Sequence, residues 1–193
     1  MSKLKWEDHV RCMAQHLAAL TCTVDRGRVV SAQQAFGLWR KWTDALRRRR
    51  GTIYLVGNGA SASMASHMAA DLAKNGRLHT EVFSDLSLIT AISNDMSYEE
   101  VFSEPLSRRA EKGDMLVAIS SSGRSPNILA AAKLARRLKL TIVTLSGMSA
   151  DNPLRAMGTL NFHVPAKTYG YVESCHAVVL HHWMDMVEWK GRR

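Results

Sequence analysis

Four ionisable side chains in this sequence have the types and spacing that a small reactive site requires. His67 and Asp71 stand four residues apart in a stretch that reads as a helix, so their side chains share one helix face. Glu173 and His181 are eight residues apart in a second helical stretch, which turns them to within about 80° of each other. Two imidazoles and two carboxylates suit Zn²⁺ or general acid–base catalysis. The alternative is structural: a hydrogen-bonded pair on the first helix, and packed or exposed rings at His181 and His182.

A serine-rich junction is the second feature that could do chemistry. Residues 120–127, with the sequence SSSGRSPN, leave an apolar run and enter a helical one. Pro126 suits the first position of that helix, and Ser125 suits the N-cap before it. Four serine hydroxyls, Arg124 and the N–H groups of a helix start would then meet at one place, as they do around a phosphate monoester. A serine-rich turn without a ligand is the alternative.

A glycine-rich junction, residues 57–63 with the sequence GNGASAS, also joins an apolar run to a helical one. Its glycines permit backbone shapes that other residues avoid, and the helix start offers N–H groups to an anion. Ala62 stands where a dinucleotide fingerprint has its third glycine, and no Gly-Lys-Ser/Thr follows as in a P-loop. A nucleotide-dependent enzyme is therefore disfavoured, whereas a tight turn without a ligand and an anion site both fit.

The framework for these junctions is predicted to be an α/β fold. Short apolar runs alternate with helical patterns after residue 50, which is typical of a parallel sheet covered by helices on both faces. The predicted strands are Thr52–Val56, Thr80–Ser84, Leu88–Ile92, Met115–Ser120, Thr141–Ser146 and Leu160–Val164. The predicted helices lie near 61–75, 99–112, 126–138 and 171–189. Without a linker-like boundary, residues 1–193 are expected to form one domain. Ligands of such sheets bind at the carboxyl ends of the strands, where both junctions fall.

Residues 1–50 are predicted to form two amphipathic helices ahead of the core at 51–193. Apolar residues at helical spacing mark one face of each, namely Met13, Leu17, Leu20 and Val24, and then Phe36, Trp39, Trp42 and Leu46. Residues 25–28 separate the two helices, and Ser31 is the expected N-cap of the second. The two apolar faces must be buried, either on the chain's own sheet or on a partner subunit.

The formal net charge is +9, and residues 1–50 carry most of it, with 11 Lys/Arg against 4 Asp/Glu. Arg47–Arg50 ends the second helix, where cations complement the negative end of the helix dipole. Since no aromatic residues are interleaved with this run, a solvated helix end is favoured over a nucleic-acid surface.

The composition, 46% hydrophobic and 22% charged, is that of a soluble globular protein. The sequence has no apolar run of about 18 residues, and no apolar stretch follows Lys3 and Lys5 as in a secretory signal. Cys12, Cys22 and Cys175 lack the spacing of a metal site or of a disulfide framework. We expect a reduced, cytoplasmic protein without a membrane partner.

Four segments together resemble the sugar isomerase (SIS) family: Gly57–Ser63, His67–Leu72, Asn94–Asp95 and Ser120–Ser125. The likeness covers about residues 30 to 190. It implies a three-layer, flavodoxin-like αβα sandwich with a five-stranded parallel sheet. It also implies a homotetramer with active sites between subunits, which would bury the N-terminal helices.

The resemblance further implies roles for individual residues. The metal and acid–base group would comprise His67, Asp71, Glu173 and His181, with one Zn²⁺ per site. Asp71 stands where glutamate is usual in the family, and Glu173 falls near the usual glutamine. A sugar phosphate would be bound by Asn58, Gly59, Ala60, Ser61, Asn94 and Asp95, with its phosphate on Ser120, Ser121, Ser122 and Ser125.

The implied activity is an aldose–ketose isomerisation that converts D-sedoheptulose 7-phosphate to D-glycero-D-manno-heptose 7-phosphate through an enediol. Asp71 or Glu173 would act as the base, and His181 as its acid–base partner. A different class of function is also open, that of a non-catalytic phosphosugar-binding or regulatory protein of the type that binds the replication initiator. The presence of both His67 and His181 favours the enzyme.

Overall fold

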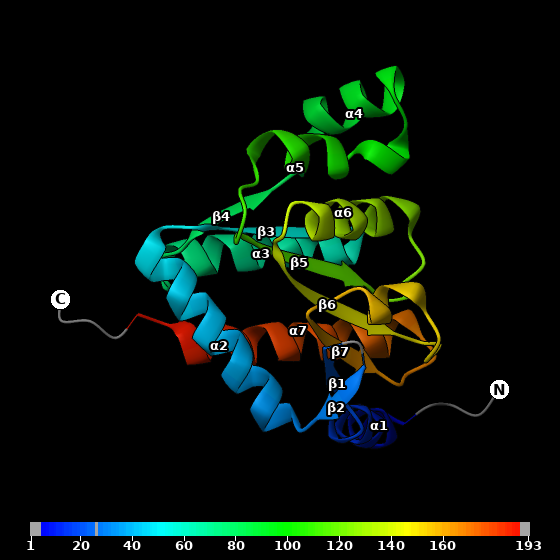
Figure 1. Cartoon of the computed structure of the whole chain (residues 1–193). Coiled ribbons are helices and arrows are strands. Elements are labelled where there is room, and N and C mark those ends of the chain that lie inside the picture. The colour runs from blue at the N-terminus through cyan, green and yellow to red at the C-terminus, as the bar shows by residue number, and fades with distance from the viewer. Residues whose placement is uncertain (1–4, 26, 190–193) are drawn as a thin grey trace.

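A seven-stranded sheet forms the centre of the computed structural model, which describes residues 5–25 and 27–189 (Figure 1). The strand order is β2-β1-β7-β6-β5-β3-β4. Five neighbouring strands run parallel: β3 (Thr52–Gly57), β4 (His79–Val82), β5 (Met115–Ser120), β6 (Thr141–Gly147) and β7 (Leu160–Val164). A hairpin of β1 (Thr21–Val24) and β2 (Arg28–Val30) adds two antiparallel strands beside β7. The predicted five-stranded parallel sheet is confirmed, and the hairpin extends it.

The central strands are apolar throughout because helices cover both of their faces. Along β3, Ile53 and Leu55 belong to the hydrophobic cluster on one face, whereas Tyr54 and Val56 belong to the cluster on the other. All six residues of β5 are buried. This pattern is the one expected of parallel strands in the middle of an αβα sandwich.

Three helices cover the first face: α2 (Ala32–Arg49), α3 (Ala60–Lys74) and α7 (Tyr169–Val187). Trp39 of α2 and Trp183 of α7 are fully buried, and their rings stack 4.0 Å apart. Ser31 caps α2 as predicted, in a capping box with Gln34. The apolar face of the second N-terminal helix is therefore buried on the chain's own sheet.

The second face is covered by α4 (Leu86–Asp95), α5 (Ser103–Arg109), α6 (Pro126–Arg137) and the short 3₁₀ helices η1 (Tyr98–Glu100) and η2 (Pro153–Ala156). Ile128, Ala131 and Ala135 of α6 are fully buried in this layer. Figure 1 shows α4 projecting from the body beyond β4, at the top of the view.

The predicted helix face containing Leu20 and Val24 is wrong beyond Ala18. Helix α1 spans Trp6–Ala18, and Thr21–Val24 pairs with β7 as a strand. The β-branched sequence TCTV favours a strand, and the positive φ angles of Asp25 (45°) and Gly27 (106°) turn the chain back into β2. The spacing of apolar residues alone could not distinguish a helix from a strand over residues 20–24.

The predicted strand Leu88–Ile92 is also wrong, because this segment lies within helix α4. The Asp85 side chain accepts a hydrogen bond from the backbone N–H of Leu88 at 3.0 Å and so caps the helix. The preceding strand ends at Val82 rather than at Ser84, and the predicted helix over 99–112 divides into η1 and α5.

Helix α1 packs against α7 through a small cluster in which Met13 and Leu17 are partly buried beside Cys175. No residue of α1 is fully buried, and the Trp6 side chain is 73% exposed. The first N-terminal helix thus leaves much of its own surface uncovered within one chain.

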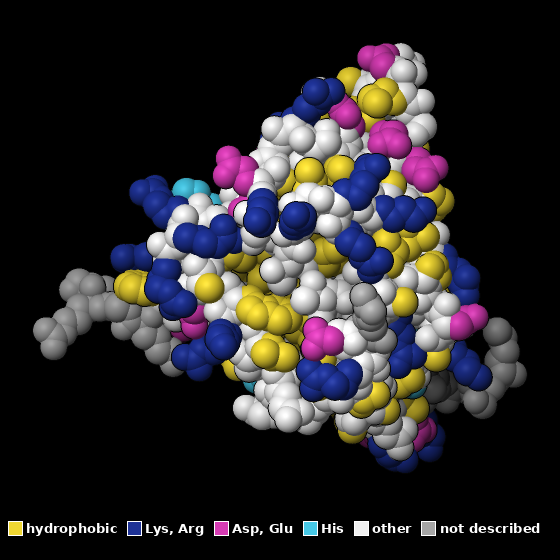
Figure 2. All heavy atoms as spheres, in the orientation of Figure 1, with side chains coloured by type: hydrophobic (Ala, Val, Ile, Leu, Met, Phe, Trp, Pro, Cys, Tyr) yellow, Lys and Arg dark blue, Asp and Glu magenta, His cyan; other side chains and the backbone are white. Residues whose placement is uncertain are grey.

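On the face shown in Figure 2, the basic residues are dispersed rather than gathered in one patch. Figure 2 shows Lys and Arg side chains scattered across this face, with Asp and Glu over α4 at the top. Within the arginine run, Arg47 pairs with Asp44 at 2.7 Å and donates from Nε to the Gly76 carbonyl at 2.8 Å. Arg49 donates to the Gly113 carbonyl. These arginines thus tie the end of α2 to neighbouring segments. Among the described helices, none combines the length and hydrophobicity needed to cross a membrane.

Candidate active site

The sheet topology brings the glycine-rich and serine-rich junctions to one edge. β3 pairs with β4 on one side and with β5 on the other, so the chain leaves the neighbouring strands β3 and β5 in opposite directions. At such a switch point a crevice opens outside the carboxyl ends of the strands. Residues 58–61 and 121–125 follow these two ends and lead into α3 and α6.

A cavity of about 160 Å³ lies between the two junctions and the start of α7. We call it the serine pocket. Hydroxyl groups dominate its wall, and the side chains of Asn58 and Glu173 complete the polar lining. The lining residues are Asn58, Ser61, Ile119, Ser120, Ser121, Ser122, Ser125, Tyr169 and Glu173.

Serine hydroxyls shape the loop that surrounds this pocket. Ser120 Oγ accepts from the N–H of Gly123 at 3.2 Å and lies 3.3 Å from Ser125 Oγ. Ser122 Oγ accepts from the N–H of Arg124 at 3.3 Å. Ser121 Oγ is buried without a hydrogen-bond partner in the described part of the chain. A buried hydroxyl without a partner is costly, and a ligand oxygen would supply the missing hydrogen bond.

Ser125 occupies the predicted N-cap position of α6, but its side chain makes no capping hydrogen bond. Its hydroxyl lies beside Ser120 instead. Pro126 has no N–H and the N–H of Ile128 donates to Asn127 Oδ1, so the N–H of Asn127 is the one that the first three residues of α6 leave available, at the positive end of the helix dipole.

Gly123 is needed for the shape of the serine loop. Its φ of +62° lies in the left-handed region, and a Cβ on this residue would fall 2.0 Å from Asn152 Oδ1. Asn152 is itself buried and donates to the Ser149 carbonyl at 2.8 Å. The loop therefore rests on a fixed side chain from the β6–η2 connection.

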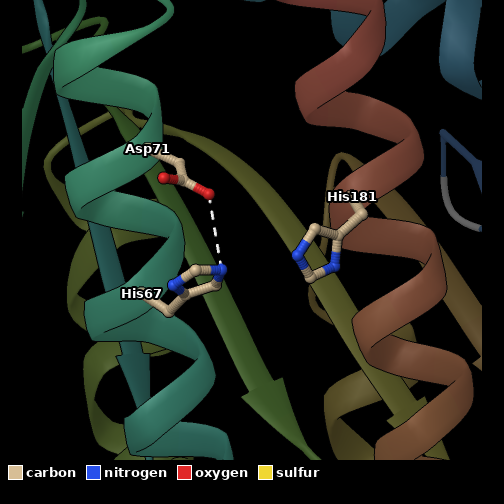
Figure 3. Close-up of side chains that lie close together, drawn as sticks. All are labelled: His67, Asp71 and His181. Carbon is tan, nitrogen blue, oxygen red and sulfur yellow. Dashed lines mark ion pairs between the residues drawn. The ribbon is translucent and has the colours of Figure 1, made fainter.

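A second polar group lies on the outer surfaces of α3 and α7. His67 Nε2 and Asp71 Oδ2 are 3.3 Å apart on α3, and the rings of His67 and His181 are 5.5 Å apart across the two helices. One potential ligand atom from each of the three residues lies within 4.8 Å of the other two. Figure 3 shows His181 of α7 facing His67 and Asp71 across the gap between the helices.

The backbone fixes the proton position on His181. Its Nδ1 lies 2.8 Å from the carbonyl oxygen of Ala177, one turn earlier in α7. A carbonyl oxygen only accepts, so Nδ1 carries a proton, and in the neutral ring Nε2 has the lone pair. This is the arrangement by which metal-binding histidines are commonly oriented.

The serine pocket and the His67–Asp71–His181 group are connected by two helices that start at the same edge of the sheet. Ser61 precedes His67 by six residues, which is about 9 Å along α3. Glu173 precedes His181 by eight residues, which is about 12 Å along α7. Since α3 and α7 pack together, the His67–Asp71–His181 group is displaced from the serine pocket by about 9 to 12 Å along the axes of these two helices.

The model of the family described as "SIS domain" matches residues 40–147, which include both junctions and the His67–Asp71 pair. The chain belongs to the SIS-domain family. A curated relative, the phosphoheptose isomerase of Helicobacter hepaticus, is 34% identical over 170 residues, covering 82% of this SIS-domain protein and 86% of the relative.

Solved structures show the same fold in other members. A phosphoheptose isomerase from Francisella tularensis has a TM-score of 0.82 at 22% identity and covers 97% of this chain and 98% of its own. The phosphoheptose isomerase from Neisseria gonorrhoeae has a TM-score of 0.79 at 24% identity, and the match covers 94% of this chain and 97% of the Neisseria chain.

Four predicted site residues of the SIS-domain protein, Gly59, Ala60, Asn94 and Asp95, lie outside both groups. Gly59 and Ala60 are exposed at the start of α3, next to the serine pocket. Asn94 and Asp95 are exposed near the end of α4, where Asn94 Nδ2 donates to Asp95 Oδ1 at 2.8 Å. Glu173 lines the serine pocket and is not among the three clustered ligand residues.

Arg124 turns away from the serine pocket, although the sequence placed it among the phosphate donors. Its guanidinium pairs with Asp151 at 3.0 Å, and both side chains are exposed. A hydrogen bond from Ser149 and the charge of Arg124 lower the pKa of Asp151. Hydroxyl and backbone donors therefore dominate the serine pocket.

Three residues near the pocket were not identified from the sequence. Tyr169 lines it from the first turn of α7. Asn127 hydrogen-bonds Asn58, and the Tyr98 hydroxyl also reaches Asn58. The only local signal for Asn127 was its polar side chain at the second position of α6, directly after Pro126.

Proposed function

We propose that this SIS-domain protein is a phosphosugar isomerase that interconverts D-sedoheptulose 7-phosphate and D-glycero-D-manno-heptose 7-phosphate. The observation that carries the proposal is the pairing of a hydroxyl-lined pocket at two helix starts with an imidazole–carboxylate group that lies about 9 to 12 Å further along α3 and α7. The names of the curated relatives, which are phosphoheptose isomerases, support the same substrate class.

The length of the substrate agrees with this separation. Eight bonds join the phosphorus atom of a seven-carbon sugar 7-phosphate to its first carbon. An extended chain advances by roughly 1.2 Å per bond, as the reach of the peptide backbone indicates, so the two ends lie about 10 Å apart. A phosphate bound in the serine pocket would then bring the first two carbons close to Asp71 and His181.

The phosphate end is proposed to bind through Ser120, Ser121, Ser122 and Ser125, together with the backbone N–H of Asn127 at the start of α6. Asn58, Gly59, Ala60 and Ser61 would contact the ligand from the start of α3. The exposed residues Asn94 and Asp95 are proposed to reach a sugar in a neighbouring subunit, in line with a homotetramer whose active sites lie between subunits.

His67, Asp71 and His181 fit a Zn²⁺ site. Two imidazoles and a carboxylate are common zinc ligands, and the unprotonated Nε2 of His181 is suited to a metal. A bound Zn²⁺ would polarise the carbonyl group of the sugar. Glu173, the fourth predicted ligand, lines the serine pocket, and we propose that it meets the sugar there.

The isomerisation needs one base and one acid. One oxygen of Asp71 would take the proton from the first carbon, and the C–H electron pair would form the C1–C2 double bond. The electron pair of the C2 carbonyl would move to its oxygen, which would take a proton from Nε2 of His181 in the doubly protonated form of that ring. In the second half of the reaction, His181 would take the proton of the hydroxyl on the first carbon, a C1 carbonyl would form, and the electron pair of the C1–C2 double bond would take the proton from Asp71 at the second carbon. A ring nitrogen that binds a metal carries no proton, so the zinc content decides between the two roles of His181.

The test compares turnover of sedoheptulose 7-phosphate by the wild type, Asp71→Asn and His181→Ala, with the zinc content measured in each preparation. Loss of a positioned acid or base lowers kcat by about 100-fold or more. Unchanged turnover in both variants would remove these residue assignments. A metal-free wild type that binds the sugar phosphate without converting it would favour a binding or regulatory protein instead.

A further inference from the structure

Asn58 and Asn127 form a reciprocal pair of amide hydrogen bonds beside the serine pocket. Asn58 Nδ2 donates to Asn127 Oδ1 at 3.0 Å, and Asn127 Nδ2 donates to Asn58 Oδ1 at 2.9 Å. Asn58 follows β3 and lines the pocket, whereas Asn127 lies in the first turn of α6 and is only 1% exposed. The pair links the two junctions that surround the pocket.

A backbone group determines the orientation of both amides. The N–H of Ile128 donates to Asn127 Oδ1 at 3.0 Å. A backbone N–H cannot accept, so the atom that it meets must be the carbonyl oxygen of Asn127. The NH₂ group of Asn127 therefore faces Asn58, and the atom of Asn58 that receives it must be Oδ1.

The carbonyl oxygen of Asn58 is thereby fully used. It accepts from Asn127 Nδ2 and, at 3.3 Å, from the hydroxyl of Tyr98, which fills both lone pairs. One N–H of Asn58 is used on Asn127 Oδ1. The group that Asn58 has left for a ligand is its second N–H.

We propose that Asn127 is a positioning residue that makes Asn58 a hydrogen-bond donor toward an acceptor oxygen of the sugar phosphate. This inference rests on the proposed function for the identity of the ligand. Without Asn127, only the 3.3 Å hydrogen bond from the Tyr98 hydroxyl orients the amide of Asn58, which can then turn its carbonyl oxygen toward the pocket, where it would repel a phosphoryl oxygen. Asn127 is therefore expected to act on ligand affinity through Asn58 and not through contact of its own.

A double-mutant cycle tests this coupling. The affinity for inorganic phosphate is measured by calorimetry for the wild type, Asn58→Ala, Asn127→Ala and the double variant, and KM and kcat are measured with sedoheptulose 7-phosphate. We expect each single variant to bind phosphate about 10-fold more weakly, and the double variant to bind no more weakly than Asn58→Ala. KM should rise by a similar factor, with kcat changed less than about threefold. Effects that multiply in the double variant would overturn the proposal, as would an unchanged affinity in Asn58→Ala.

Controls separate positioning from loss of stability. Asn161 is buried and hydrogen-bonded to Thr144 away from the serine pocket, so Asn161→Ala should lower the melting temperature and leave phosphate affinity unchanged. Asn127→Asp keeps the bond from Ile128 and serves if Asn127→Ala does not fold. The added negative charge should weaken phosphate binding both in the protein with Asn58 and in the Asn58→Ala background. The positioning effect should appear only where Asn58 is present.

A measurement on the amide itself does not depend on catalysis. In the ¹⁵N–¹H spectrum, one side-chain proton of Asn58 should exchange slowly in the wild type and rapidly in Asn127→Ala, with Asn58→Ala identifying the signal. Rapid exchange of both protons in the wild type would refute the pairing.

If the wild type binds phosphate but does not isomerise the heptose, the proposed function fails while coupling in the cycle still supports Asn127. If it binds neither ligand, the positioning role is refuted as well.

Discussion

His176 of α7 is fully buried against the carboxyl end of β6, where its Nε2 lies 3.1 Å from the carbonyl oxygen of Ser146. Burial is the main cause that lowers the pKa of His176 to about 4, and burial also lowers the pKa of His163 on the neighbouring strand β7. The unfolded chain then binds more protons than the folded one between about pH 4 and 6.5. Full stability is present above pH 6.5 and decreases as the pH falls through this range.

Unfolding by urea at several pH values measures this effect. His176 alone should lower the free energy of unfolding by about 3 kcal/mol between pH 6.5 and 4. His176→Gln retains a donor for the carbonyl oxygen of Ser146 and should make the free energy of unfolding less dependent on pH. The pH dependence that remains in this variant is expected to come from His163. The same substitution at exposed His79 is the control. An equal pH dependence in the wild type and His176→Gln would contradict the assignment.

At this scale, the sequence predicted pairs that lie on one helix and missed pairs that join distant segments. The spacing of His67 and Asp71 within α3 was sufficient to predict their contact. The Asn58–Asn127 pair joins residues 69 positions apart, so no local pattern reports it. The location of Glu173 depended on how α7 is placed against the serine loop, which residue spacing does not give.

At the scale of elements, the serine loop depends on both a backbone angle and a neighbouring side chain. Gly123→Ala should cost at least about 1 kcal/mol from its positive φ, and the contact with Asn152 adds to this cost. We expect a lower melting temperature together with weaker phosphate binding, because the loop must shift.

The matched control is Gly27→Ala in the β1–β2 turn. Gly27 also has a positive φ, of +106°, but a Cβ there would meet no atom within 4 Å. Calorimetry with inorganic phosphate should therefore show normal affinity in this variant and a loss in Gly123→Ala. Equal phosphate affinities would mean that the contact with Asn152 does not shape the loop.

Element boundaries were predictable where periodicity and a cap agreed and unpredictable where they competed. For α2, the apolar spacing and Ser31 gave the same answer. For residues 88–92, a short apolar run suggested a strand, while the cap at Asp85 started a helix. For Leu20 and Val24, helical spacing was accidental, and pairing with β7 determined the structure.

At the scale of the whole molecule, we expect four chains to assemble. Helix α1 leaves Trp6 73% exposed and Val10 47% exposed, and a neighbouring subunit would cover such apolar side chains. Light scattering should give four times the 21.5 kDa of one chain. Val10→Glu should shift the mass toward smaller species and lower the turnover, since the sites are proposed to lie between subunits. A wild-type mass of one chain with full activity would contradict this.

The composition of the serine pocket has a consequence for evolution and engineering. No Lys or Arg is among the described residues that line it. Several hydroxyls, together with the start of α6, are instead proposed to bind the phosphoryl group. No single replacement removes the attraction for a dianion, since each neutral donor contributes only about 1 kcal/mol, or a several-fold change in affinity. The proposed phosphoryl binding would thus be shared among several donors, so that substitution of a single serine during evolution is expected to be tolerated while the geometry of the helix start is retained.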